Sequence, residues 1–279
     1  LANVNIPEPE SLYRQPRFGS VATRGPDDSL ARRYGTSCSK RHPYRKYGQD
    51  FGVDPSLPDK EYTHQAYQAY LKKYLRCVKG VDDNLKRLFD ALCGSGAMDK
   101  TAIFYTGDQG FMLGEHDYID KRWMYEESMR MPLLVRYPRM VRAGSRTDLL
   151  VNNTDFAPTM LELAGAEVPE LMQGRGFVAA LAGREPANWR TATYYRYWMH
   201  LTHHDVPAHF GVRTKRYKLI FYYGRALPRY RGKKSMRWLR ASYPVCPSPP
   251  GWELYDLKKD PHELVNEYGN PKYAKVAAQ

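Results

Sequence analysis

Two oxygen-bearing side chains follow a short apolar run near the middle of the chain. The run extends from Thr101 to Thr106, and after it Asp108 and Gln109 stand between two glycines. An aspartate at the carboxyl end of a buried strand lies where open α/β sheets bind their ligands. A carboxylate and an amide carbonyl are hard oxygen donors, which suit Ca²⁺ or Mg²⁺ better than zinc. The pattern leaves two interpretations open: a cation site, or an ordinary turn in which Asp108 caps the backbone.

A cluster of histidines is the second candidate for chemistry. His200, His203, His204 and His209 lie within residues 194–213, among aromatic residues and close to Arg213. Polar donors beside aromatic rings would suit a sugar that carries an anionic group. His200, His204 and Arg213 are the candidate substrate contacts, and the pattern does not say which histidine would touch the sugar. Structural packing and a zinc site are the alternatives, although the helical pattern H-E-x-x-H is absent.

Helices and strands of an α/β protein must position these residues. Apolar residues at spacings of three and four predict a long helix over residues 61–93, which two glycines end. The β-rich runs 101–106 and 133–137 predict buried strands. A shorter helix is expected over residues 153–165, capped by Asp155 or Asn153. A sheet with flanking helices therefore makes the fold class α/β.

The two ends of the chain differ from its middle. Residues 1–60 are rich in Pro, Gly, Arg and Tyr, and predict loops with at most short helices. The last twenty residues predict turns and a short helix. Four short β-rich runs before them predict a small antiparallel sheet, at residues 192–198, 211–214, 217–223 and 253–257.

Several segments, in one order along the chain, resemble the sulfatase family of the alkaline phosphatase superfamily. The match runs from about residue 65 to the C-terminus, and it is similar to bacterial sulfatases that act on carbohydrates, including N-acetylglucosamine-6-sulfatase-like members. A single matching segment would be weak support, but several segments in the order found in the sulfatase family make the resemblance specific. The segments are Asp108-Gln109-Gly110, Leu113-Gly-Glu-His116, Lys121, Tyr125-Glu-Glu-Ser128, Pro132-Leu-Leu-Val-Arg-Tyr-Pro138, Asp155-Phe-Ala-Pro-Thr159, Gly211-Val-Arg-Thr-Lys-Arg-Tyr-Lys218, Glu253-Leu-Tyr-Asp-Leu257 and Asp260-Pro-His-Glu263.

The resemblance implies roles for matched residues. Asp108 and Gln109 would be ligands of a divalent cation, usually Ca²⁺ in this family. Lys121 would contact the sulfate group, where an ammonium neutralises the charge that develops on the sulfuryl oxygens; the alternative is a solvated surface lysine. His116 would line the site or buttress its loop.

The resemblance also implies an architecture. We expect a partial mixed sheet with flanking helices, followed by a small antiparallel-sheet subdomain. The expected divisions are an irregular connecting region over residues 1–60, the C-terminal part of the main α/β domain over 61–189, and the subdomain over 190–279.

The chain departs from the family where the nucleophile should be. Sulfatases convert the cysteine of C-x-[PA]-x-R into formylglycine, and no cysteine here fits that pattern. Neither Asp-Asp pair follows an apolar strand near the N-terminus, as the family's early metal pair does. We therefore expect a fragment that is inactive alone and binds metal weakly, because Ca²⁺ prefers six to eight oxygens. The four cysteines, Cys38, Cys77, Cys93 and Cys246, leave their pairing open.

Composition and charge narrow the partners. A hydrophobic content of 42% excludes a disordered chain, and no apolar run is long enough for a membrane span. The net charge of +13 favours anionic partners. Seven basic residues precede position 241 in the loop 225–251, which we interpret as a solvated loop or a docking site for sulfated polysaccharide rather than for a specific nucleic acid.

Three hypotheses for function follow. The first is a sulfatase acting on sulfated carbohydrate, exported to the periplasm or cell exterior by family resemblance, although no signal peptide is visible. The second is a phosphatase or phosphonate hydrolase of the same superfamily. The third is a non-catalytic remnant that binds polyanions, which salt-sensitive binding without turnover would favour.

Overall fold

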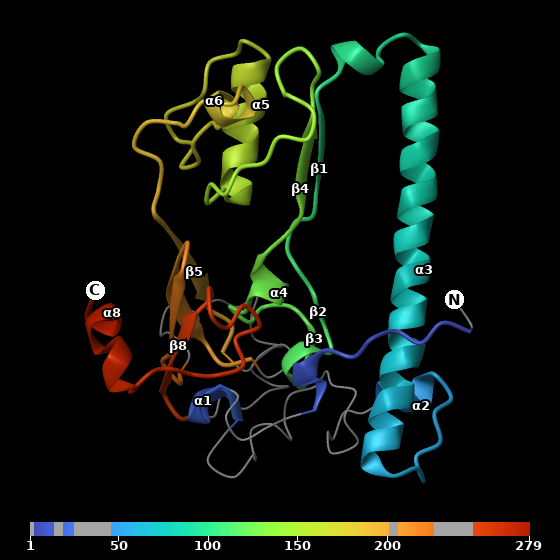
Figure 1. Ribbon diagram of the computed structural model, residues 1–279, viewed down its shortest axis with the longest axis vertical. Coiled ribbons are helices and arrows are strands. Elements are labelled where there is room, and N and C mark those ends of the chain that lie inside the picture. The colour runs from blue at the N-terminus through green and yellow to red at the C-terminus, as the bar shows by residue number, and fades with distance from the viewer. Residues whose placement is uncertain (1–2, 14–18, 25–45, 201–205, 226–247) are drawn as a thin grey trace, which may run out of the picture. The chain divides into compact units, whose positions relative to one another are not determined.

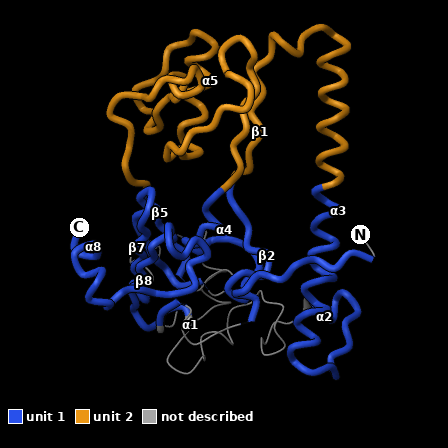
Figure 2. Tube along the Cα trace, viewed as in Figure 1, with its two compact units in different colours: residues 1–78, 109–130, 194–279 blue, residues 79–108, 131–193 orange. Residues whose placement is uncertain are grey.

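The computed structural model of the protein describes residues 3–13, 19–24, 46–200, 206–225 and 248–279 (Figure 1). His204 and most of the basic loop 225–251 lie outside these residues. The chain forms two compact units. Unit 1 comprises residues 1–78, 109–130 and 194–279, and unit 2 comprises residues 79–108 and 131–193 (Figure 2). The expected divisions at residues 60 and 190 stay predictions.

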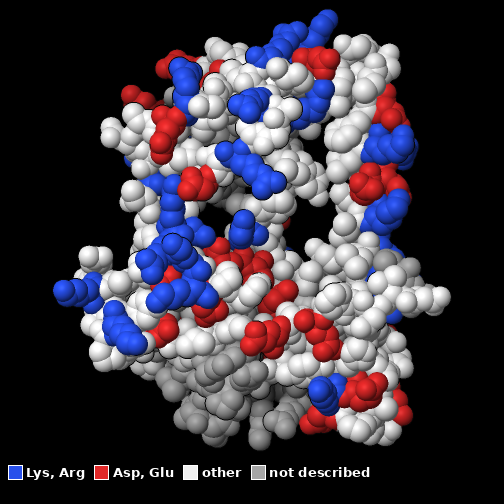
Figure 3. Space-filling model, in the orientation of Figure 1, with Lys and Arg blue, Asp and Glu red and all other residues white. Residues whose placement is uncertain are grey.

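The long helix predicted over residues 61–93 is confirmed as α3, Asp59–Gly94. Its first half supplies Tyr62, Ala66, Tyr67 and Leu71 to a core cluster that also contains Leu12, Val53 and Ile119. The apolar stripe continues beyond this cluster but is not buried there, since Val78, Val81 and Leu88 are 45–51% exposed. Acidic and basic side chains alternate along the same exposed part of the helix (Figure 3).

Two of the predicted strands pair in unit 2. They are β1, Ile103–Thr106, and β4, Leu133–Arg136, which run antiparallel. The expectation that both are buried is wrong: Tyr105 is 38% and Leu134 is 64% exposed. In the described part of the chain these strands pair only with each other, so each keeps an open edge and a partly open face.

The predicted helix over residues 153–165 forms in two parts. The 3₁₀ turn η4, Asn153–Asp155, leads into α5, Phe156–Leu163. Asp155, one of the two expected caps, stands at the N-cap position of α5, but its side chain makes no cap hydrogen bond to this helix. Asn152 caps η4 and shares a capping box with Asp155. The other helical elements of this unit are the 3₁₀ turn η2, Met98–Lys100, and α6, Val178–Leu181.

The small antiparallel sheet predicted near the C-terminus is confirmed, with the order β5-β6-β7-β8. Phe210 stands opposite Phe221, which stands opposite Trp252. The alternate residues, such as Ile220 and Tyr222, face a second core cluster. The α/β class is therefore confirmed. The strands are β5, Ala192–Tyr197; β6, His209–Thr214; β7, Tyr217–Tyr222; and β8, Gly251–Asp256.

Short elements complete unit 1, as the irregular composition of both ends predicts. They are the 3₁₀ turns η1, Glu10–Leu12, and η7, Pro271–Tyr273, with the helices α1, Val21–Arg24; α2, Lys46–Asp50; and α8, Ala274–Ala278. Within the described ranges, no helix combines the length and apolar character that crossing a bilayer requires.

Candidate functional site

The motif segment 109–130 is part of unit 1. Its two ends contact each other at Gly110. The Gly110 amide donates to the Ser128 carbonyl over 3.0 Å. A Cβ at Gly110 would lie 2.2 Å from the Glu127 carbonyl oxygen and 2.9 Å from that of Arg130, so no larger residue fits without moving the backbone. The two ends of the segment are therefore held together by a contact that requires glycine.

The backbone between these ends is unusually strained. A short hairpin of β2, Met112–Leu113, and β3, Ile119–Asp120, encloses the 3₁₀ turn η3, Glu115–Asp117. Six non-glycine residues have positive φ in the described chain, and four lie here: His116 at 54°, Asp117 at 59°, Asp120 at 101° and Arg122 at 92°. Each such residue costs on the order of 1–3 kcal/mol, and such strain clusters at functional sites.

Lys121 lies between two of these strained residues, Asp120 and Arg122. The Arg122 guanidinium pairs with the Asp120 carboxylate, so an ion pair closes the turn across Lys121. The Lys121 side chain is partly exposed, and its Nζ lies 5.7 Å from the centre of the Phe111 ring. No carboxylate of the residues that the structure describes lies within ion-pair distance of it. The ammonium is therefore available to an anion.

The turn is also held from the C-terminal sheet. The Tyr195 hydroxyl on β5 donates to the Arg122 carbonyl over 3.0 Å. His209 on β6 lies beside it, with ring centres 5.7 Å apart, and its Nδ1 lies 2.7 Å from the Pro207 carbonyl. Burial lowers the pKa of the His209 imidazole to about 4, against hydrogen bonds with the Pro207 and Arg122 backbones, so the ring is neutral at pH 7.

The candidate histidines are buried in this structure. His116 stacks on Tyr125 with ring centres 4.3 Å apart, and its amide donates to the Ser11 hydroxyl. His200 accepts a hydrogen bond at Nδ1 from the Ala208 amide over 3.0 Å. Their proposed substrate contacts stay predictions, because both side chains are at most 5% exposed here. His204 lies outside the described residues.

Arg213 belongs to a buried charge network. Its guanidinium donates to both carboxylate oxygens of Glu126, over 3.2 and 2.9 Å. Lys218, which is fully buried, lies 2.9 Å from Glu126 and 2.7 Å from Glu263. Burial favours a raised pKa for Glu126, but the two cations outweigh it and lower this pKa to about 2. The predicted substrate contact of Arg213 stays a prediction, and here its guanidinium neutralises Glu126.

Two neighbouring carboxyls have raised pKa values, in contrast to the lowered pKa of Glu126. Burial raises the pKa of Glu127 to about 7, and the carboxylates of Glu263 and Glu115 add to this shift. Burial likewise raises the pKa of Glu263 to about 7, although Lys218 opposes it. Near neutral pH this network therefore holds both ionised and protonated carboxyls.

The two expected cation ligands, Asp108 and Gln109, have the oxygen atoms that a divalent cation prefers, but they are too few to bind it alone. Asp108 is exposed beyond the end of β1, and Gln109 is partly buried. Asp108 ends a segment of unit 2 and Gln109 begins one of unit 1, so the structure places each with its own unit. The described residues contain no group of three or more His, Cys, Asp or Glu that could hold an ion. Two oxygens are too few for Ca²⁺.

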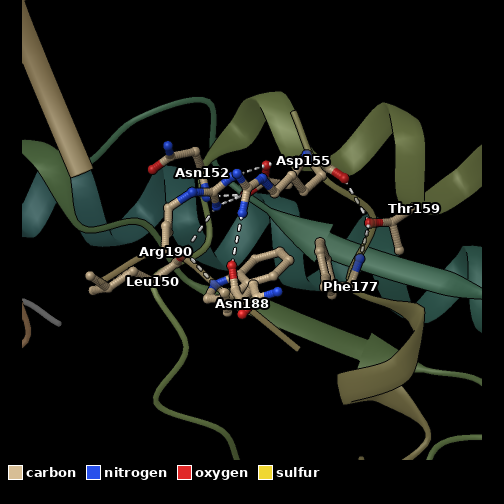
Figure 4. A network of polar contacts seen from close by, with 9 residues as sticks. Leu150, Asn152, Asp155, Thr159, Phe177, Asn188 and Arg190 are labelled. Carbon is tan, nitrogen blue, oxygen red and sulfur yellow. Dashed lines mark hydrogen bonds and ion pairs between the residues drawn. The ribbon is translucent and has the colours of Figure 1, made fainter. Parts of the chain in front are cut away.

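A second motif residue, Asp155, forms a closed network in unit 2 (Figure 4). The side chain is completely buried and pairs with Arg190 through both oxygens. The amides of Asn152 and Arg175 donate to the same carboxylate over 2.7 and 2.8 Å. Its main-chain carbonyl accepts from the Thr159 hydroxyl. Every oxygen of Asp155 is therefore satisfied within the protein, which indicates a structural role.

Sequence reasoning missed three parts of the Lys121 surroundings. It did not find the Asp120–Arg122 ion pair, the Tyr195 contact or the strained backbone. The pair Asp120 and Arg122 flanks Lys121 with opposite charges, and that spacing could have suggested a closed turn. No sequence signal identifies Tyr195, because its partner is 73 residues away.

Two family models match the chain. The model described as Sulfatase matches residues 10–166, and the model described as N-sulphoglucosamine sulphohydrolase, C-terminal, matches residues 114–230. Together they include Lys121 and the motif segment around it. The Sulfatase match alone covers more than half of the chain.

Curated relatives agree with these models. An N-acetylglucosamine-6-O-sulfatase of Bacteroides thetaiotaomicron is 43% identical over 211 residues, which are 75% of this chain and 34% of that protein. The multifunctional alkaline phosphatase superfamily protein PehA of Trinickia caryophylli is 30% identical over 213 residues, covering 72% of this chain and 37% of that protein. The chain thus spans about a third of the length of these relatives.

Solved structures match this chain over a larger share of its length than these curated relatives do. One, of a protein in complex with its substrate D-glucosamine-2-N,6-O-disulfate, gives a TM-score of 0.75 at 33% identity and covers 99% of this chain and 58% of that one. A phosphonate monoester hydrolase of Agrobacterium radiobacter gives a TM-score of 0.56 at 25% identity, covering 81% of this chain and 42% of that one.

Proposed function

Because this chain belongs to the sulfatase family, we propose that it serves the hydrolysis of sulfate esters on carbohydrates. In this reaction the S–O bond to the sugar breaks, water adds to sulfur, and an alcohol and a sulfate ion leave. The names of the relatives support a glycosaminoglycan-type substrate, since two of them act on or bind glucosamine sulfates. The chain would contribute the part of the site that holds the sulfate group.

The presentation of Lys121 carries this proposal. Its turn is closed by an ion pair, and it lies between two residues whose backbone is strained. Since no described carboxylate pairs with the ammonium, its charge is free to act on the three sulfuryl oxygens. A preorganised positive charge stabilises negative charge that develops in the transition state.

The metal and the nucleophile belong to the family's chemistry but do not enter these steps. We propose Asp108 and Gln109 as two ligands of a divalent cation, Ca²⁺ by family resemblance, with the remaining ligands outside the described residues. The cation would polarise the sulfate ester. Formylglycine has no matching cysteine motif in these 279 residues. His116, His200, His204 and Arg213 stay candidates for contacts to the sugar.

The family also bears on cellular location. We propose a periplasmic or extracellular site of action, in keeping with the family. The basic composition of the chain, at a net charge of +13, would favour approach of such a polyanion.

Binding to the chain itself tests the role of Lys121. Glucosamine 6-sulfate and inorganic sulfate are titrated into the purified protein and followed by ¹H–¹⁵N NMR, with Lys121→Ala beside it. We expect shifts centred on residues 111–122 that vanish in the variant. Lys100→Ala, which removes an exposed lysine of unit 2, is the matched control and should bind as the unaltered chain does. Equal binding by Lys121→Ala would sink the proposed role of this residue.

A second candidate reaction is hydrolysis of phosphate or phosphonate monoesters. The similarity to PehA and to the phosphonate monoester hydrolase favours it. The product of the complete reading frame that encodes this chain is assayed with 4-nitrophenyl sulfate, 4-nitrophenyl phosphate and a phenylphosphonate ester. A higher kcat/KM for the sulfate supports the first proposal, and a higher value for either phosphorus ester supports the second.

A further inference from the structure

The Arg122 carbonyl is the point where the Lys121 turn meets the C-terminal sheet. It accepts the Tyr195 hydroxyl, and the two residues lie 73 positions apart in the chain. This is a long-range hydrogen bond to the main chain directly after Lys121. The carbonyl belongs to the peptide that follows Arg122, so this bond restrains the backbone of the turn one residue beyond Lys121.

We propose that Tyr195 is a positioning residue, whose hydroxyl fixes the Arg122 peptide and thereby aims the Lys121 ammonium at the sulfate group. This inference rests on the proposed role of Lys121 and deepens it. Tyr195 touches no substrate in this proposal and acts only through the turn.

The turn needs an external restraint because its own backbone does not favour its shape. Asp120 and Arg122 both hold positive φ, which non-glycine residues adopt rarely. Their ion pair joins side chains and does not act on the main chain. The Tyr195 hydrogen bond acts on the Arg122 carbonyl itself, so it adds a main-chain restraint to the ion pair and to the contact between His209 and the Arg122 backbone.

The position of Tyr195 is itself well defined. Its ring lies 5.7 Å from His209, whose ring lies 4.9 Å from Tyr222 and 6.3 Å from Trp123. This aromatic packing leaves the phenol little rotamer freedom. Burial raises the pKa of the Tyr195 hydroxyl to about 12, so it is a protonated donor near neutral pH.

The adjacent residue on β5 offers a matched control. Tyr194 faces away from the core, is 60% exposed, and lies near Phe210 with ring centres 6.4 Å apart. Tyr194→Phe and Tyr195→Phe make the same chemical change one residue apart on one strand. Only the second removes a hydrogen bond to the Arg122 carbonyl.

The test measures the NMR signal of the Lys121 side chain. Lysines in the product of the complete reading frame are dimethylated with ¹³C-formaldehyde, and the Lys121 signal is assigned by its loss in Lys121→Arg. We expect Tyr195→Phe to move this signal towards the position of a solvent-exposed lysine, to narrow it, and to reduce its shift on addition of sulfate at least threefold. Tyr194→Phe should leave all three unchanged. An unchanged Lys121 signal in Tyr195→Phe would overturn the proposal.

Kinetics separate positioning from a general loss of fold. Tyr195→Phe should lower kcat for the sulfate ester roughly tenfold, with a smaller change in KM, because misplacement acts on the reacting geometry. A fall shared equally by Tyr194→Phe would also overturn the proposal. The two proposals fail in different ways. If Lys121→Ala leaves sulfate binding unchanged, the proposed role of Lys121 is wrong, whereas the Lys121 signal in Tyr195→Phe still decides whether Tyr195 positions this lysine.

Discussion

Lys121 in unit 1 and Asp155 in unit 2 both belong to sulfatase motifs, yet their surroundings are opposite. Asp155 is completely buried, and its carboxylate accepts from Arg190 and from two amides. Lys121 is partly exposed, and no described carboxylate pairs with it. The protein therefore satisfies one charge internally and leaves the other available to a ligand.

This difference distinguishes motif residues that stabilise the fold from motif residues that are available to a ligand. A buried charge whose hydrogen bonds are all satisfied makes the structure rigid, and removing its partners is costly. A charge on a strained turn that has no partner is available for chemistry. Removing Asp155 should then act on stability, and removing Lys121 should act on ligand binding. Each prediction that follows challenges this division.

The largest effect is expected at Asp155. Asp155→Ala leaves the Arg190 guanidinium without its carboxylate and two amides without their acceptor. Breaking a buried pair by removing one partner costs about 3–5 kcal/mol. Urea unfolding followed by circular dichroism measures it. A loss below about 1 kcal/mol would remove the structural half of the comparison.

The reverse pattern is expected at Lys121. Lys121→Ala should change the free energy of unfolding by no more than about 0.5 kcal/mol, since the side chain has no described ion pair. Hydrolysis by the product of the complete reading frame should fall about 10²–10³-fold in kcat, the usual loss when one stabilising group is removed. A large loss of stability with normal hydrolysis would contradict the functional half.

The Glu127 carboxyl predicts a dependence of stability on pH. Its folded pKa of about 7 exceeds the ordinary value of 4.5, so the folded state binds the proton more tightly. Stability should then fall as pH rises from about 4.5 to 7. Glu127→Gln should remove the part of this fall that Glu127 causes, while Glu263, whose pKa is also about 7, keeps its own part. Between pH 5 and pH 8 the variant should therefore lose about 1–3 kcal/mol less stability than the parent.

Denaturation at both pH values checks this prediction, with Glu185→Gln as a control on an exposed carboxyl. An equal pH dependence in Glu127→Gln and the parent would show that Glu127 titrates normally. It would also show that burial in unit 1 does not perturb this carboxyl.

The smallest effect is expected on the exposed part of α3. The Lys86 ammonium lies 2.5 Å from the Asp90 carboxylate, but both side chains are well exposed. Exposed pairs of this kind contribute little, because water and salt screen them. Lys86→Ala should therefore leave the unfolding midpoint within measurement error at 0.15 M salt. A shift as large as that of Asp155→Ala would show that burial does not set the ranking.

The sequence was sufficient for elements whose signal is local. The helix expected over 61–93 is Asp59–Gly94, because apolar spacing and terminal glycines are properties of the segment itself. The strand expected over 217–223 is β7, Tyr217–Tyr222, for the same reason. Pattern matching also placed Lys121 in a family context that the comparisons confirm.

Long-range partners could not be predicted in this way. Asp155 was expected to cap a helix, but its main partner is Arg190, 35 residues further on. The burial of β1 and β4 was wrong because burial depends on which neighbours cover a strand, not on its own composition. Positive φ at Asp120 and Arg122 carries no residue signal, since the surrounding structure imposes it.

The 73-residue separation of Tyr195 and Arg122 has a consequence for the order of folding. Contacts between distant residues form late, because loop closure must precede them. The Lys121 turn should therefore become ordered only after β5 has joined its sheet, with its interactions largely absent from the folding transition state. Tyr195→Phe would then speed unfolding and leave the folding rate nearly unchanged. The reactive geometry would be the last feature of the protein to form and the first to be lost.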